Sequence, residues 1–494
     1  MISGSTRRQE TPLVHAERTA LVQLCATRGI LYHPLMPSEP SQQMTVQQAM
    51  ELALRHAQAG YVERAIEIYQ QIVAAEPDIG EAWNDLGSAL LRTRRYPQAV
   101  EALRKAELLC PQLPQPLSNL GNALRLQEQL DEAIAVLQRA VQLHPEFPSA
   151  ENNLGAALFA AGQYEQAISH FERAIQLQPD LAQPHHNLSM ALLLREDWDR
   201  GLREHEWRVK VDPQIIGLRR RISQPEWDGS DPAGKRILVY AEQGLGDTIQ
   251  FARYLSVLWS RGAQPILRCR SELVELMQTL PGALTIIADN SPVPPFDLHA
   301  ALLSLPLLCG AWPPWGVPVP SPYLHADPRK ADAWKRRTEA LGAARKVGLA
   351  WAGNPNHEND RSRSISPIEL SPLSQAPDVR FVSLQKQADE RLALLPGDIE
   401  IVDWTAELRD FSDTAALVDA LDLVITADTA VAHLAGAMGK PVWVLLPFVP
   451  DWRWMLGRCD SPWYPTMRLF RQPVAKDWKT AVQEIAHLLR SERR

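Results

Sequence analysis

The second half of the chain alternates short apolar runs with longer stretches of helical periodicity. Strands of a parallel sheet read as nearly continuous apolar runs, because helices cover both faces of the sheet. From Arg236 onward the pattern therefore predicts doubly wound α/β structure. The proline-rich span 306–328 divides the strands into two lobes, and Trp478–Leu489 is predicted to form a closing helix that crosses back onto the first lobe. The predicted strands are Ile237–Ala241, Pro265–Cys269, Leu284–Ala288, Lys346–Ala350, Arg380–Leu384, Ile399–Val402, Asp422–Thr426, Val442–Leu446 and Met467–Phe470.

The first half follows a helical pattern that repeats every 34 residues. This period is typical of the two-helix tetratricopeptide unit, in which small residues let the helices approach and a proline ends the second helix. The last unit, from Ala182, has Gly201 where alanine is expected, and such a degenerate unit caps the array or docks it on a neighbour. The repeated positions are Pro77, Pro111, Pro145 and Pro179, then Ala65, Ala99, Ala133 and Ala167, then Ala53, Gly87, Gly121 and Gly155.

These patterns predict an α + α/β protein in five segments. They are a leader or irregular cap at 1–43, a solenoid of tetratricopeptide repeats at 44–208, a linker at 209–235, a first lobe at 236–325 and a second lobe at 326–494. The repeat array offers a surface suited to an extended protein chain, whereas the two lobes hold the candidates for chemistry.

Composition narrows the class of partner. The net charge of -7 and the pI near 6.0 give no general attraction to nucleic acid or anionic membranes. The cysteines form no C-x-x-C pair, so neither a zinc site nor a disulfide framework is indicated. No stretch approaches the ~18 apolar residues of a membrane span. We expect a cytoplasmic protein without a membrane span.

The segment Leu423–Val444 is the most informative about chemistry. It predicts a buried strand, a sharp turn at Asp428 and Thr429, a helix of small residues and a second buried strand. If Asp428 caps the helix, the N–H groups of Thr429, Ala430 and Val431 point outward at the positive end of the helix dipole. This is a predicted phosphate seat.

A second turn of this kind lies in the first lobe. The strand that ends at Tyr240 runs into Gly244-Leu-Gly246-Asp247, followed by a helical pattern. Two strand–turn–helix sites in two α/β units predict a ligand held between the lobes.

The motifs Glu242–Phe251, Val347–Asn354 and Asp428–Gly436 together resemble the heptosyltransferase-like glycosyltransferases of the GT-B fold. Behind tetratricopeptide repeats they are similar to bacterial repeat-containing glycosyltransferases, including enzymes thought to modify flagellin. The resemblance implies an inverting transfer from a nucleotide-sugar, with Asp247 as the general base. Heptose transfer is not implied, because heptosyltransferases usually lack such repeats and act on lipid-linked sugars.

Two residues have competing interpretations. Asp247 can accept the proton of an acceptor hydroxyl, or it can cap the helix that begins beside it. His433 lies one helical turn after Thr429, where it can contact the ligand or pack against the lobe.

A departing nucleotide phosphate needs positive charge near it. The loop that follows the strand Lys346–Ala350 supplies arginines and small donors, and a glutamine–lysine pair ends the next strand; a solvated loop is the alternative. No Asp-x-Asp lies at a strand end, so no metal and no cofactor is expected. The aromatic segment 447–454 adds Asp451 and Arg453 as polar candidates. The predicted donor-binding residues are Gly244, Gly246, Asn354, Arg361, Arg363, Ser364, Gln385, Lys386, Asp428, Thr429, Ala430 and His433.

Asparagine recurs on the first helix of successive repeats, at Asn119, Asn153 and Asn187. The pattern resembles the asparagine ladder of O-GlcNAc transferase, whose carboxamides suit an extended peptide backbone. Asparagine is also common at this position in tetratricopeptide repeats generally, so a structural role stays open.

Three functions remain from the sequence. The first is a metal-independent glycosyltransferase whose repeats recruit a protein acceptor, with flagellin as one possibility; a lipid- or glycan-linked acceptor is its variant. The second is a repeat scaffold with an inactive transferase domain. A nicotinamide dehydrogenase ranks last, because Ile249 occupies the place of the third glycine of G-x-G-x-x-G.

Overall fold

The computed structural model describes residues 44–313, 321–355, 359–376, 378–386, 394–397 and 399–492. They form two compact units, one ending at Asn187 and the other beginning at Leu188. The predicted segment 1–43 lies outside the described residues.

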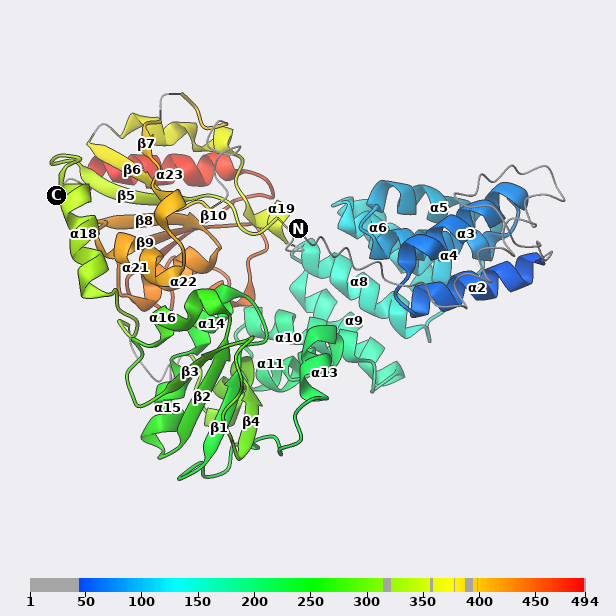
Figure 1. The fold of residues 1–494 in the computed structure, drawn as a ribbon. Helices are drawn as coiled ribbons and strands as arrows, with labels where there is room; N and C mark the ends of the chain where they lie inside the picture. Colours follow the sequence, from blue (N-terminus) through cyan, green and yellow to red (C-terminus); the bar gives the residue numbers. More distant parts are fainter. Residues whose placement is uncertain are drawn as a thin grey trace, which may run out of the picture. The chain divides into compact units, whose positions relative to one another are not determined.

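The first unit is a stack of helix pairs (Figure 1). Each repeat proline follows the last residue of its second helix by two positions, as Pro77 follows Ala75, because proline cannot continue the helix. The repeated glycine is explained by packing: a Cβ on Gly87 would lie 2.4 Å from Leu103 Cγ, and one on Gly121 would lie 2.3 Å from Leu137 Cγ. The helices are α2 (Val46–Gln58), α3 (Val62–Ala75), α4 (Gly80–Arg92), α5 (Tyr96–Leu109), α6 (Pro114–Leu126), α7 (Leu130–Leu143), α8 (Pro148–Ala160) and α9 (Tyr164–Leu177).

Helix α10 (Ala182–Leu194) contains the division between the units, and α11 (Trp198–His205), α12 (Arg208–Val211) and α13 (Pro213–Arg219) belong to the second unit. The predicted boundary at 208 differs from this division. Trp198 is buried against Trp452 and Trp463, with ring centroids 6.0 and 5.9 Å away. The end of the predicted solenoid therefore packs as part of the α/β unit.

The first lobe is a four-stranded parallel sheet in the order β3-β2-β1-β4. Its strands are β1 (Arg236–Tyr240), β2 (Gln264–Cys269), β3 (Thr285–Ala288) and β4 (Leu298–Ala301). Strand β4 has no counterpart among the predicted strands, because its sequence Leu-His-Ala-Ala is not an apolar run. The helices and turns of this lobe are α14 (Leu245–Phe251), α15 (Tyr254–Ser260), η1 (Ser271–Leu273), α16 (Val274–Met277), η2 (Leu302–Ser304) and α17 (Leu305–Cys309).

The second lobe is a six-stranded parallel sheet in the order β10-β9-β8-β5-β6-β7. Its strands are β5 (Arg345–Ala350), β6 (Val379–Ser383), β7 (Ile401–Val402), β8 (Leu423–Ala427), β9 (Val442–Leu446) and β10 (Met467–Arg471). Its described helices and turns are α18 (Pro328–Glu339), α19 (Asp360–Arg363), η3 (Pro367–Gln375), η4 (Thr405–Glu407), α21 (Phe411–Asp419), α22 (Ala430–Ala437), η5 (Trp452–Trp454) and α23 (Trp478–Ser491).

Helix α23 forms where the closing helix is predicted, but its packing differs from the prediction. Its buried residues, including Val482 and Ile485, lie in the core of the second lobe together with Val347 and Leu349 of β5. The apolar face of α23 is thus covered by the sheet of its own lobe. The α-solenoid followed by a two-lobed, doubly wound domain is the fold class that the sequence predicts.

Candidate active site

Helices α14 and α22, one from each lobe, lie side by side in Figure 1 and meet near their N-terminal ends. They approach closely at Gly246, where a Cβ would lie 2.7 Å from His433 Cδ2 and 3.4 Å from Ala430 Cα. A side chain at 246 would therefore disturb this close approach of α14 and α22. Gly244 is exposed and precedes α14 as its N-cap.

Both carboxylate oxygens of Asp247 are engaged. Oδ2 accepts a hydrogen bond of 2.8 Å from the backbone N–H of Gly244, the N-cap residue, which is the half of a capping box that a glycine cap allows at the start of α14. Oδ1 accepts from Arg453 Nη2 at 2.5 Å, across the lobes. The capping role of Asp247 is therefore present, and its second oxygen faces an arginine of the other lobe.

Arg453 is the central cation of the site. Its side chain is 7% exposed, and Nη1 donates to Asp451 Oδ1 at 2.9 Å while Nη2 binds Asp247. The guanidinium carbon lies 4.3 Å from the ring centroid of Trp452. A buried guanidinium between two carboxylates is held firmly, because charge-assisted hydrogen bonds are stronger than neutral ones.

The turn before α22 differs in detail from the predicted seat. Thr429, not Asp428, is the N-cap, and its Oγ1 accepts from the N–H of Val431 at 3.3 Å. The carbonyl of Thr429 accepts from the N–H of Ala432. The prediction that Asp428 caps this helix is wrong, because the helix begins one residue later than expected and the extended residue before it, with φ −139° and ψ 172°, is Thr429. The N–H of Val431 is thus already bonded within the turn.

Asp428 carries less negative charge near neutral pH than an ordinary aspartate. Burial, and then the nearby carboxylate of Asp451, raise its pKa to about 6, while the indole of Trp454 and the guanidinium of Arg363 act in the opposite direction. The backbone carbonyl of Asp428 also accepts from Arg363 Nη1 at 3.3 Å. The guanidinium of Arg363 at this carbonyl favours an anion at the start of α22.

His433 packs in the second lobe. Its Nδ1 lies 3.0 Å from the Tyr464 hydroxyl, and its ring stacks on Trp454 with centroids 5.2 Å apart. Burial, and then the neighbouring arginines, lower its pKa well below the ordinary value, so the imidazole is neutral at pH 7. The packing interpretation accounts for these contacts; ligand contact by His433 stays a prediction.

Most of the remaining predicted donor-binding residues bond to nearby loops and strand ends, and one contacts the site. Gln385 Oε1 accepts from the backbone N–H groups of Trp351 and Ala352 at 3.1 and 2.8 Å, which fixes the end of β5. Ser364 Oγ accepts from Gly353 N–H at 3.0 Å and donates to Asp360 at 2.8 Å.

Among the cations of this group, Arg363 is the one whose side chain bonds to the α22 turn. Lys386 donates to the backbone carbonyl of Leu408, and Arg361 is exposed at α19. Asn354 is exposed just before residues 356–358, which lie outside the described part of the chain.

The asparagines of the first unit bond between neighbouring repeats. Asn119 Nδ2 donates to Asn84 Oδ1 at 2.9 Å, and Asn187 Nδ2 donates to Asn152 Oδ1 at 2.8 Å. Asn153 Nδ2 likewise donates to the Ser118 hydroxyl at 2.9 Å. The amide donors of the predicted ladder thus hold neighbouring repeats together. A bound peptide would have to use the same side chains.

This bonding gives a prediction. The triple variant Asn119→Ala/Asn153→Ala/Asn187→Ala should lose roughly 1 kcal/mol of stability for each hydrogen bond, because the partner groups remain partly buried. Urea unfolding of the full chain measures the loss. Asn122→Ala is the control, since Asn122 bonds to Arg125 within its own helix. A triple variant as stable as the control would contradict the inter-repeat role.

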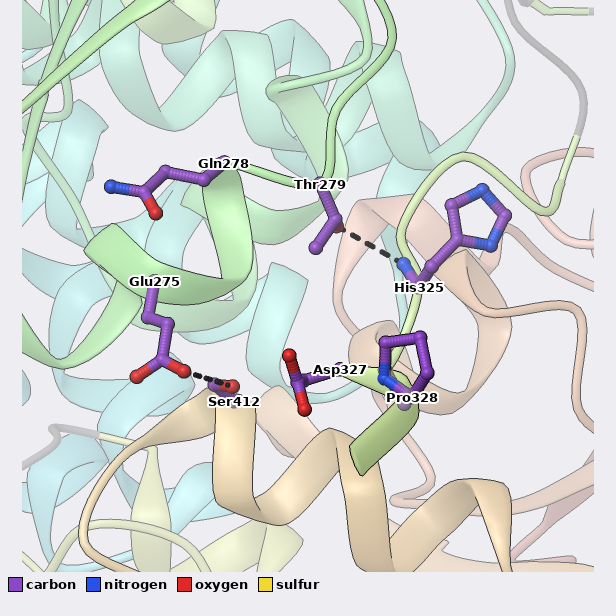
Figure 2. A pocket seen from close by; sticks show the side chains of 8 residues that line it. Glu275, Gln278, Thr279, His325, Asp327, Pro328 and Ser412 are labelled. Atoms are coloured by element: carbon purple, nitrogen blue, oxygen red, sulfur yellow. Dashed lines mark hydrogen bonds between the residues drawn. The ribbon is translucent and has the colours of Figure 1, made fainter. Parts of the chain in front are cut away.

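A pocket of about 380 Å³ lies elsewhere between the lobes (Figure 2). It is lined by Glu275 in α16 and Gln278 at the end of that helix, and by Asp327 and Ser412 at the starts of α18 and α21. Ser412 donates to Glu275 at 3.1 Å across it. Beside it, Lys330 Nζ lies 2.7 Å from Glu275 and 2.9 Å from Asp413. This ion-pair cluster joins the lobes away from the Asp247–Arg453 pair.

The cluster should stabilise the domain in a pH-dependent way. Burial acts to raise the pKa of Asp413, but hydrogen bonds from Arg409 and Lys330 outweigh it and lower the pKa from 3.8 to about 2. A depressed carboxyl pKa stabilises the fold above pH 4, and that contribution is lost as the pH falls from about 4 to 2. Asp413→Asn should therefore lower the urea midpoint at pH 7 and approach wild type near pH 2. A difference that stays constant with pH would contradict this assignment.

Comparison with known proteins agrees with the two-part architecture. Residues 50–114, 121–162 and 148–181 match tetratricopeptide repeat families. Residues 372–445, which contain β8, α22 and the Thr429 turn, match the family described as Glycosyltransferase family 9 (heptosyltransferase). The chain therefore contains segments that match tetratricopeptide repeat families and one segment that matches the glycosyltransferase family 9 model. The Thr429 turn lies within that last segment, and Arg453 lies shortly after its end.

Protein FlbA of Caulobacter vibrioides is 31% identical over 310 residues, which cover 56% of this chain and 49% of FlbA. The chain thus spans about half the length of this curated relative. Among solved structures, a thermophilic tetratricopeptide-repeat protein of Thermus thermophilus is 19% identical over 36% of this chain and 96% of its own, with a TM-score of 0.33. MamA from Desulfovibrio magneticus is 22% identical over 36% and 97%, with a TM-score of 0.28.

No helix in the described part of the chain is long and apolar enough to cross a bilayer.

Proposed function

We propose that this protein is an inverting, metal-independent glycosyltransferase that moves a sugar from a nucleotide-sugar to a protein acceptor recruited by its repeats. The observation that carries the proposal is the Asp247–Arg453 pair, which lies where α14 and α22 meet and joins the two lobes of the glycosyltransferase domain. A carboxylate and a buried cation at one point are the two groups that inverting transfer requires.

In this mechanism the acceptor hydroxyl attacks the anomeric carbon and its proton passes to Asp247. The bond from the anomeric carbon to the phosphate oxygen breaks, and the nucleotide leaves with the electron pair. Arg453 and Arg363 stabilise the developing phosphate charge at the start of α22, so positive side chains do the work of a metal ion. Asp247 Oδ1 is bonded to Arg453 in the free protein, and donor phosphate competes for that guanidinium and frees the oxygen.

The acceptor is proposed to bind along the repeats, with flagellin as one candidate. Asn119, Asn153 and Asn187 recur on the first helices of three repeats, and their carboxamide oxygens are the acceptors that peptide N–H groups need. A lipid- or glycan-linked acceptor is the alternative. It predicts that protein lacking the repeats pulls down the same protein partners from a cell extract as the full chain does.

The alternative of an inactive scaffold is favoured by one observation, the full engagement of both Asp247 oxygens. A thermal-shift screen with UDP-, GDP-, ADP- and CMP-sugars, followed by assay of nucleotide release, separates the two functions. A donor at ~100 times its Kd stabilises the fold by ~2.7 kcal/mol. Stabilisation with turnover supports the enzyme, stabilisation without turnover supports the scaffold, and no stabilisation by any donor contradicts the donor site.

The donor seat makes its own prediction. Ala430 is the first residue of α22, where proline fits the helix but removes an N–H. Ala430→Pro should weaken nucleotide binding by about 10-fold, because a hydrogen bond to a charged group contributes roughly 1.5–3 kcal/mol. Isothermal titration with the stabilising nucleotide measures the change, and Ala430→Ser, which keeps the N–H, is the control. Equal nucleotide affinity in the two variants would show that the phosphate does not bind the N–H of Ala430.

A further inference from the structure

We propose that the helical segment Trp198–Val211, which comprises α11 and α12, positions the Asp247–Arg453 pair, and that Arg208 and Trp198 are the residues through which it acts. The inference rests on the proposed function of that pair. It assigns a part in the chemistry to residues that the repeat pattern places at the degenerate end of the solenoid.

Arg208 fixes the loop that leads into α14, the helix of Asp247. Its side chain is 2% exposed, and Nη2 donates to Glu242 Oε1 at 2.8 Å and to the Ser304 hydroxyl at 2.8 Å. Glu242 has a fully buried side chain and lies on the loop between β1 and α14, five residues before Asp247.

Glu242 in turn is bonded to the backbone of the first lobe. Its Oε2 accepts from the N–H of Leu302 at 3.0 Å, and its Oε1 accepts from the N–H of Leu303 at 3.1 Å. Burial raises the pKa of Glu242, and the charge and hydrogen bonds of Arg208 act in the opposite direction. The loop between β1 and α14 is thus held at Glu242 from both sides.

Trp198 and His205 fix the loop that carries Arg453. Both are buried, and their rings lie 6.0 Å from the Trp452 ring, edge to face. Trp452 is the residue before Arg453, and its ring also lies under the Arg453 guanidinium. A shift of the Trp452 ring would therefore move the cation.

One segment of 14 residues thus contacts the supports of both partners, which come from different lobes. Two groups that cooperate in proton transfer and leaving-group stabilisation must hold their separation closely, since about 1 Å of misplacement costs about 10²-fold in rate. The segment meets this need because it bonds to the Glu242 loop through Arg208 and packs on Trp452 through Trp198. It also continues directly from α10, the last helix in the repeat register.

Two full-length variants test the inference. Arg208→Gln/Glu242→Gln removes both charges of the fully buried pair together, and leaves only the partly exposed Glu206, which also binds Arg208 at 2.9 Å, without its cation. Trp198→Ala removes the contact with Trp452, and Trp198→Phe restores part of it. The control is Arg236→Gln/Asp297→Asn, a pair at the opposite end of β1 from Glu242.

Hydrogen exchange and kinetics are measured on each variant. Exchange should rise in peptides covering 243–248 and 451–455 in both test variants but not in the control. Nucleotide release from whichever UDP-, GDP-, ADP- or CMP-sugar the wild type uses should fall at least about 10-fold in kcat, with KM for the donor changed by less than about three-fold. Trp198→Phe should recover most of the loss.

Unchanged exchange in both peptides would overturn the inference. It would also be overturned if exchange rose equally across the whole domain while kcat and donor affinity fell in parallel. If wild type releases nucleotide from none of the four donors, the proposed function fails. The exchange result then still decides whether the segment positions the two loops.

Discussion

Asp247→Asn is expected to lower turnover by about 10² or more while the fold and the donor affinity are retained. Asparagine keeps an oxygen that can accept from the Gly244 N–H, so the hydrogen bond at the start of α14 survives. What is lost is the group that accepts the acceptor's proton, and general-base catalysis typically contributes ~10²–10⁴-fold. Steady-state kinetics with the stabilising donor, together with its Kd, measure both quantities.

Asp451→Asn is the matched control for this variant. Asp451 also binds Arg453, at 2.9 Å, so it shares with Asp247 the task of holding that cation. If Asp247 only orients Arg453, the two variants should lose similar amounts of turnover. A near-normal kcat in Asp247→Asn would assign the base role to another residue.

Arg453→Gln is expected to weaken nucleotide binding by at least about 10-fold and to lower turnover further. The guanidinium is buried and its charge is close to the α22 turn, so its hydrogen bonds to phosphate form in a partly desolvated site. Arg453→Lys keeps the charge but loses the planar fork, and it should fall between Arg453→Gln and wild type. Titration calorimetry with the stabilising nucleotide checks the order of the three affinities.

Arg453→Gln also leaves two carboxylates without their cation, which costs stability of its own. Urea unfolding of the same samples separates this cost from the loss of binding. Arg458→Gln is the control, because Arg458 lies on the same segment and pairs with Asp460 at 2.9 Å. If Arg453→Gln bound nucleotide as tightly as the wild type, Arg453 would not be a donor-binding residue.

Much of the fold could be predicted because its signals are local. The 34-residue period reflects close packing that recurs in each repeat, as between Gly87 and Leu103 and between Gly121 and Leu137. The apolar runs indicate strands that are covered on both faces. Strand β4 could not be predicted, since its pairing with β1 compensates for a short sequence that contains a histidine. The packing of α23 was also beyond the pattern, which shows an apolar face but not what covers it.

The site could be predicted less fully, because several of its side chains act through contacts distant in sequence. The aspartate of the first turn and the Thr429 turn are recognisable motifs, and the aromatic segment points to Arg453. The pairing of Asp247 with Arg453 spans 206 residues, however, and the link from Arg208 through Glu242 joins the end of the helical region to the first lobe. No feature of the neighbouring sequence distinguishes these charged residues from solvent-exposed ones. The preference of Thr429 over Asp428 as N-cap likewise depends on backbone geometry.

The most direct test of the account is transfer itself. Purified full-length protein is incubated with the stabilising nucleotide-sugar, labelled in the sugar, and an extract of cells that lack the protein; label in protein, lipid and free sugar is then separated. The account predicts label in protein with the wild type, undiminished by EDTA and lost with Asp247→Asn. Label confined to lipid or glycan, strict dependence on Mn²⁺, or equal protein labelling by Asp247→Asn would contradict it.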